Sequence, residues 1–130
     1  MIFLLDVNAL VALGFQRHEF HDQLASWDRM RQPRLATCSI TELGFVRILT
    51  QTPIYDLTIT QARGLLVRFK ETVAPRLTFI NDNHDISHLP GWVRAPKQIT
   101  DGHLARLANE NGTVLATLDK RIPGSFLIPL

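Results

Sequence analysis

The sequence is nearly free of cysteine, and its single thiol, Cys38, cannot form a disulfide within the chain. A disulfide framework and a cysteine-rich zinc site are therefore excluded, and the reducing cytoplasm is the expected location. Long hydrophobic runs are also missing. Met1–Leu5 is apolar throughout, but it is much shorter than the roughly 20 residues of a membrane-spanning helix. It lacks the basic segment of a secretory signal, so we expect no membrane association.

Neither sign of charge dominates, because 14 lysines and arginines face 12 aspartates and glutamates. Hydrophobic residues make up 45% of the 130-residue chain, enough for a core and too many for a disordered protein. With no repeat or linker, we expect one domain over residues 1–130. If a cation occupied four of the acids, a basic surface would remain, suited to a polyanion. An ordinary solvated surface is the alternative interpretation.

Short apolar runs alternate with amphipathic segments along almost the whole chain. The pattern predicts strands at 2–6, 34–38, 77–80, 113–117 and 125–128, and helices at 8–14, 19–31, 39–50, 61–73 and 100–109. Residues 81–97, which contain Pro90-Gly91, are expected to be a loop with at most one short helix. Strands that alternate with helices form βαβ units. We therefore predict an α/β fold with a parallel sheet of about five strands and helices on both faces.

Polar residues mark the expected helix ends. Asn8, Thr60 and Thr100 are expected N-caps, and Ser39 with Glu42 has the spacing of a capping box. Asn111-Gly112 is expected to end the last helix in a left-handed turn.

Four acidic residues occur at comparable places in this pattern. Asp6 and Asp119 directly follow apolar strands, whereas Glu42 and Asp101 fall in the first turns of helices. Each has a local alternative as a turn, cap or helix-dipole residue. Together they are predicted to meet at the carboxyl edge of the sheet, where α/β folds build their sites. Carboxylates gathered there repel one another unless a hard divalent cation neutralises them, which indicates a Mg²⁺ or Mn²⁺ site.

Four segments resemble those of PIN-domain nucleases, specifically the VapC-type toxins of bacterial toxin–antitoxin pairs. They are Leu4–Leu10, Ser39–Arg47, Ile99–Ala105 and Leu115–Lys120, in the family's order and with compatible spacing. The resemblance implies a single PIN-like domain and a Mg²⁺- or Mn²⁺-dependent endoribonuclease. This enzyme would be the toxin of a type II toxin–antitoxin system, with a cognate antitoxin and a homodimeric state.

The resemblance also implies roles for individual residues. The acidic metal site would consist of Asp6, Glu42, Asp101 and Asp119. Asn8 and Thr117 would be supporting polar residues, and Gly102 stands where many relatives carry alanine, which should loosen the start of that helix. Lys120 and Arg121 follow Asp119 directly and are the best-placed candidates to bind the RNA backbone.

Other interpretations remain open. A phosphatase of the haloacid dehalogenase type needs a second acid two residues after Asp6, where this chain has Asn8. A catalytically silent RNA-binding or scaffold domain would gain nothing from an acidic pocket. The pairs His18/His21 and His84/His88 are interpreted as surface residues, which would bind a soft metal if they are helical. Phe15, Phe20, Leu24, Phe45 and Ile48 are candidates for a dimer surface or for the core.

Overall fold

The computed structural model describes residues 1–130 and contains one five-stranded parallel sheet. The strands are β1 (Ile2–Leu5), β2 (Arg34–Cys38), β3 (Leu77–Ile80), β4 (Val114–Thr117) and β5 (Phe126–Leu127). They are arranged in the order β3-β2-β1-β4-β5, so β1 is the central strand. Leu4 of β1 lies opposite Ala36 of β2 on one side and Leu115 of β4 on the other. The predicted fold class and parallel sheet are confirmed.

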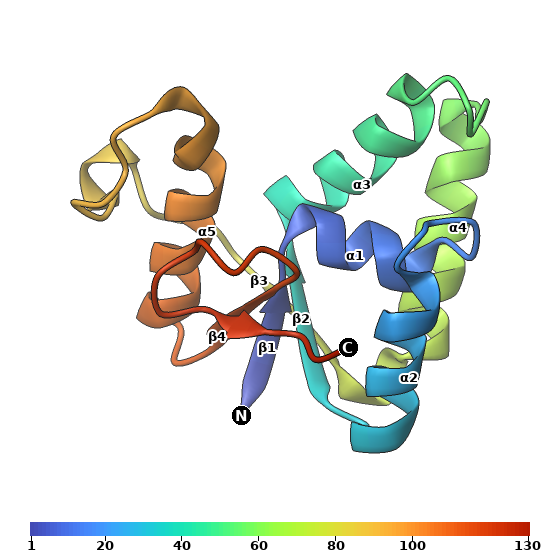
Figure 1. Ribbon diagram of the computed structural model, residues 1–130, viewed down its shortest axis with the longest axis horizontal. Helices are drawn as coiled ribbons and strands as arrows, with labels where there is room; N and C mark the ends of the chain where they lie inside the picture. The colour runs from blue at the N-terminus through green and yellow to red at the C-terminus, as the bar shows by residue number, and fades with distance from the viewer.

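Five α-helices cover the two faces of this sheet (Figure 1). They are α1 (Val7–Gly14), α2 (His21–Arg31), α3 (Ser39–Gln51), α4 (Ile59–Thr72) and α5 (Ile99–Glu110). Figure 1 shows α5 on one side of the sheet and α1–α4 on the other. Three short 3₁₀ helices, η1 (Ala74–Arg76), η2 (Ile86–His88) and η3 (Pro96–Gln98), lie between α4 and α5. No helix combines the length and the apolar character that crossing a membrane requires.

The sheet separates two hydrophobic cores, which explains the unbroken apolar run at the start of the sequence. Leu5 packs into the larger core with α1–α4, whereas Leu4 packs into the smaller core with α5. Both side chains are fully buried. Successive residues of a strand point to opposite faces, so a strand covered on both faces must be apolar at every position.

The first predicted caps are displaced by two residues. Asp6, not Asn8, is the N-cap of α1, and its side chain accepts a hydrogen bond from the Ala9 N–H. Thr58, not Thr60, caps α4, where it forms a capping box with Gln61. In α1 the cause is plain: the chain turns into the helix directly after β1, so Asp6 already occupies the half-helical position.

The starts of α3 and α5 also differ from the prediction. Cys38 precedes α3, and its N–H donates to the Thr41 hydroxyl, so the Ser39–Glu42 capping box is wrong. The α5 helix starts at Ile99, which places Thr100 inside its first turn. Glu42 is therefore not used in capping, and its carboxylate is available for other contacts.

Part of the suggested dimer surface is core. Phe15, Leu24 and Phe45 are buried among the helices α1–α4 and cannot offer a surface, whereas Phe20 is 43% exposed. Trp92 packs against the smaller core.

Gly102 allows a close approach between α5 and the loop before it. A Cβ atom at this position would lie 2.2 Å from Cγ2 of Val93, so any side chain here would displace the loop. The helix nevertheless runs without interruption from Ile99 to Glu110. A glycine in the first turn of α5 therefore lets the irregular segment pack directly beside Asp101.

Candidate functional site

Asp6 lies at the carboxyl end of the central strand and is almost completely buried, with 4% of its surface exposed. One carboxylate oxygen accepts a hydrogen bond of 2.8 Å from the Ala9 N–H. Burial raises the pKa of Asp6 to about 6, an increase that the Thr117 hydroxyl and the Ala9 N–H oppose. The charges of Asp101 and Asp119 contribute to this increase in the pKa. No lysine or arginine pairs with Asp6, so its ionised form is held without a counter-charge from the chain.

Asp101 and Asp119 approach Asp6 from two other elements. Asp101 lies in the first turn of α5, where burial and the neighbouring charge of Asp119 raise its pKa. Asp119 follows β4 and is bound by Arg121, whose Nε and Nη2 donate to its two carboxylate oxygens at 2.9 and 3.0 Å. These hydrogen bonds lower the pKa of Asp119. The fold thus brings together three aspartates from distant parts of the sequence, and their negative charges repel one another.

Thr117 connects two of these aspartates. Its hydroxyl oxygen accepts a 2.9 Å hydrogen bond from the Asp119 N–H, and its side chain is fully buried. The hydroxyl proton remains available to Asp6, whose pKa this residue lowers. Thr117 therefore favours the ionised carboxylate that a metal ligand must be.

Glu42 occupies the same end of the sheet but is already neutralised. Its carboxylate accepts a 2.7 Å hydrogen bond from Thr37, at the carboxyl end of β2, and a 2.8 Å ion pair from Lys70 of α4. None of the pKa shifts of the three aspartates is traced to Glu42. The structure thus brings together Asp6, Asp101 and Asp119 and holds Glu42 in a separate ion pair.

A cleft of about 1040 Å³ opens beside this edge. Asp6, Asn8, Thr117, Asp119, Lys120 and Arg121 are among the residues that line it. Arg17 and Phe20, from the connection between α1 and α2, form part of another wall. The cleft therefore combines buried negative charge with exposed arginine and lysine side chains.

Several contacts at this edge were not predicted. Thr37 has the same signal as Thr117, a hydroxyl residue at the carboxyl end of a buried strand, and could have been found from it. Lys70 gave no such signal, because its contact with Glu42 joins helices that only the tertiary fold brings together. The same holds for Asp82, which lies before η2 and forms a hydrogen-bonded pair with His103 of α5.

The three aspartates use oxygen donors only, which suits a hard divalent cation. Their donor atoms are spread more widely than those of a bound ion's ligands, and Arg121 holds Asp119 aside. The only three histidine, cysteine or acidic side chains that each bring one donor atom within 4.8 Å of the other two are His84, His88 and Glu110.

No protein-family model matches this chain. The chain is 35% identical to Ribonuclease VapC38 of Mycobacterium tuberculosis over 124 residues, which cover 89% of this chain and 84% of that protein. The chain belongs to the VapC ribonuclease family. It is also 32% identical to Ribonuclease VapC39 of the same species, with 96% and 94% of the two chains covered.

A structural neighbour agrees with this assignment. A chain in the crystal structure of VapBC2 from Rickettsia felis, bound to a DNA fragment from their promoter, has a TM-score of 0.64 to this chain. The likeness covers 98% of this chain and 97% of the other at 19% sequence identity, and it establishes the fold. The resemblance of the four sequence segments to VapC-type PIN nucleases is confirmed. Within this VapC-type fold, the aspartate edge is the candidate active site.

Proposed function

We propose that this VapC-family chain is a Mg²⁺- or Mn²⁺-dependent endoribonuclease that hydrolyses phosphodiester bonds in RNA. The observation that carries the proposal is Asp6, a buried carboxylate with a raised pKa and two further aspartates nearby but no basic partner. Neutral pH is above the Asp6 pKa of about 6, so the carboxylate is ionised there. Keeping this buried charge lowers the stability of the fold. A divalent cation offsets that cost.

The donor set fits the proposed ion. Carboxylate oxygens suit Mg²⁺ and Mn²⁺, whereas Zn²⁺ prefers nitrogen and sulfur donors. Asp6 and Asp101 would hold the ion directly, and Asp119 and Glu42 directly or through water. When bound, the ion supplies charge stabilisation at phosphorus and makes a water molecule more acidic.

The chain itself would bind and orient the substrate. Lys120 and Arg121 lie along the cleft beside the aspartates and present positive charge to successive phosphates. Arg17 also lines the cleft, where its guanidinium donates to the Ile54 and Tyr55 carbonyl oxygens. Asn8 offers an exposed amide close to Asp6. Because Arg121 also binds Asp119, entry of a cation would free this guanidinium for the RNA backbone.

We propose further that the chain is the toxin of a type II toxin–antitoxin system and forms a homodimer. Its family relatives and the VapBC2 complex support a protein antitoxin as the partner. The antitoxin would place a basic side chain against the aspartate edge, since a guanidinium there replaces the cation and closes the cleft.

The direct test is RNA cleavage by Asp6→Asn in the presence of Mg²⁺. We expect the rate to fall at least about a hundredfold, because the substitution keeps the shape and removes the charge. Asp22→Asn is the matched control: it makes the same chemical change close to a helix start, but on the exposed surface of α2. Sequencing of the RNA ends in total RNA identifies the cut sites. Cleavage at the wild-type rate by Asp6→Asn would overturn the proposal.

A catalytically silent RNA-binding domain is the remaining alternative from another class. Calorimetric titration with Mg²⁺ and Mn²⁺ separates the two, since a silent binder has no use for an ion at Asp6. We expect heat from a saturable site in the wild type and none in Asp6→Asn.

A further inference from the structure

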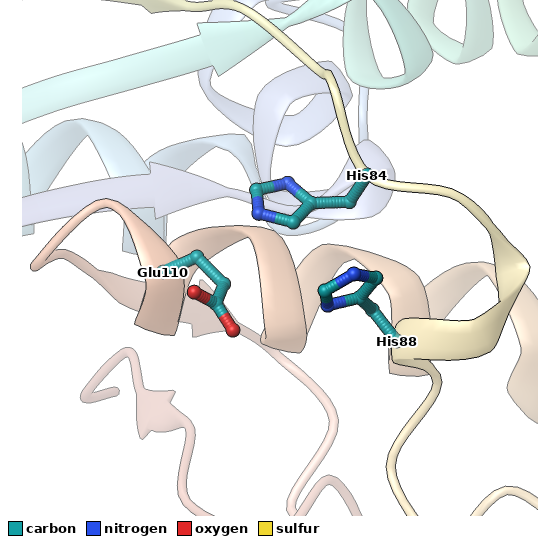
Figure 2. A group of neighbouring side chains, drawn as sticks. All are labelled: His84, His88 and Glu110. Atoms are coloured by element: carbon teal, nitrogen blue, oxygen red, sulfur yellow. The ribbon is translucent and has the colours of Figure 1, made fainter.

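A second group of potential ligands lies away from the aspartate edge (Figure 2). It consists of His84, in the loop after β3, His88, the last residue of η2, and Glu110, the last residue of α5. One donor atom from each side chain lies within 4.8 Å of the donor atoms of the other two. Figure 2 shows His84 and His88 on the stretch that runs from the loop into η2, and Glu110 on the neighbouring helix α5.

The imidazole rings of His84 and His88 form no hydrogen bonds within the chain. The rings of His18, His21 and His103 each form a hydrogen bond, to Phe20, Ala12 and Asp82 respectively. In contrast, Nδ1 of His84 is buried without any hydrogen-bond partner, the only buried side-chain nitrogen or oxygen in that condition. His88 also forms no side-chain hydrogen bond, and its ring lies 5.0 Å from that of His84. A buried polar atom without a partner costs free energy unless a ligand satisfies it.

We propose that His84, His88 and Glu110 bind a borderline transition-metal ion such as Zn²⁺. Two imidazole nitrogens and one carboxylate form a known three-ligand zinc set, which leaves a fourth position for water or another ligand. Ligand atoms around tetrahedral zinc lie roughly 3.3 Å apart, so small side-chain rotations close the present spacing. Mg²⁺ is disfavoured because it selects oxygen donors.

The position of Glu110 adds an electrostatic argument. It ends α5, where the helix dipole is negative and a carboxylate is unfavourable unless a cation is near. Arg106, one helical turn earlier, partly meets this need with an Nε–Oε1 ion pair of 3.1 Å. Arg106 therefore competes with a metal ion for the same carboxylate.

The bound ion would tie the segment between β3 and α5 to the far end of α5. That segment contains only the short helices η2 and η3 as regular structure. It also carries Asp82, which binds His103, and Val93, which packs on Gly102 beside Asp101. Zinc at this cluster would thus hold in place the loop that packs on the first turn of α5.

The test is a calorimetric titration of the whole chain with Zn²⁺ in buffer that contains excess Mg²⁺. We expect one zinc ion per chain in the wild type. His84→Ala removes a direct ligand, and Glu110→Gln removes the charge of another. Each should weaken binding at least about tenfold, because changes to the residues around metal ligands already cost this much. His18→Ala is the control for a histidine outside the cluster. Circular dichroism checks that each variant is folded, and Co²⁺ absorption reports whether imidazole nitrogen binds the ion.

Two further variants make the outcome decisive. Arg106→Ala releases Glu110 from its ion pair and should tighten zinc binding. Asp6→Asn should leave zinc binding unchanged, so failure at this cluster is distinguishable from failure at the aspartate edge. The absence of a saturable zinc site, or zinc binding that survives both His84→Ala and Glu110→Gln, would overturn the proposal.

Discussion

Asp101 and Glu110 lie in the same helix, α5, and their surroundings differ in kind. Asp101 is in the first turn, half-buried and close to two other aspartates, with a raised pKa. Glu110 is the last residue, exposed and close to two imidazoles and Arg106. The dipole of α5 favours an acid near the N-terminal end, at Asp101, and opposes one at the C-terminal end, at Glu110. The two carboxylates are nine residues apart, about 13 Å along the axis.

Under the two proposals, one helix would serve two kinds of ion. At its N-terminal end, oxygen donors and accumulated negative charge suit a hard cation that exchanges with water and phosphate. At its C-terminal end, nitrogen donors suit a borderline cation, which would be retained as part of the fold. The chemistry of the neighbouring side chains, more than the acid itself, decides which ion each end prefers.

The largest expected effect comes from replacing the carboxylate at either end of α5 with an amide. Asp101→Asn should reduce Mg²⁺-dependent RNA cleavage at least about a hundredfold and leave zinc binding unchanged. Glu110→Gln should leave Mg²⁺ binding unchanged and weaken zinc binding. Cleavage assays and paired titrations with the two ions measure both effects. If Asp101→Asn also abolished zinc binding, the two ends would not be independent.

A middle-sized effect is expected on stability. Burial raises the pKa of Asp6 from 3.8 to about 6, so the fold favours its neutral form. This contribution is fully present below pH 3.8 and is lost as the pH rises through about 6. At pH 7.5 and without a divalent cation, Asp6→Asn should therefore raise the free energy of unfolding by about 3 kcal/mol.

Urea denaturation near pH 4 and pH 7.5 measures this effect on Asp6→Asn. Asparagine still accepts the Ala9 N–H as an N-cap, so the difference between the variants should be small near pH 4. Mg²⁺ should stabilise the wild type more than the variant. A variant less stable than the wild type at pH 7.5 would show that Asp6 is favoured as an anion.

The smallest expected effect concerns the acid that the chain neutralises itself. Lys70→Ala removes the ion pair with Glu42, which is partly exposed and contributes less than about 1 kcal/mol to stability. Glu42 would then be free to turn toward an ion at the aspartate edge, and Mg²⁺ affinity should rise by less than about tenfold. Calorimetry measures the change. If the Mg²⁺ affinity did not change, Glu42 would not be part of the metal site.

The fold was largely predictable because its signals are local. Apolar runs such as Ile2–Leu5 and Val114–Thr117 become strands, and each is followed or preceded by a helix with its own period. The caps were less predictable because several polar residues compete for each helix start. Asp6 and Asn8 have similar cap propensities, and only the point at which the strand ends decides between them.

Some contacts of the candidate sites were predictable from the sequence and others were not. Asp6 and Asp119 were predictable from their places after strands, since all carboxyl ends of a parallel sheet share an edge. The pairing of Glu42 with Lys70 and the approach of Glu110 to His84 were not, because they depend on distances between helices and an irregular loop. No periodicity in the sequence records those distances.

The strand order has a consequence for the time at which the protein becomes active. The central strand β1 is made first, but its neighbour β4 is made more than a hundred residues later. Asp6 and Asp119 meet only when these two strands pair, and such long-range pairing forms late in folding. A nascent chain whose β4 is still inside the ribosome exit tunnel therefore has no assembled aspartate edge, so the candidate active site forms only after Asp119 has emerged.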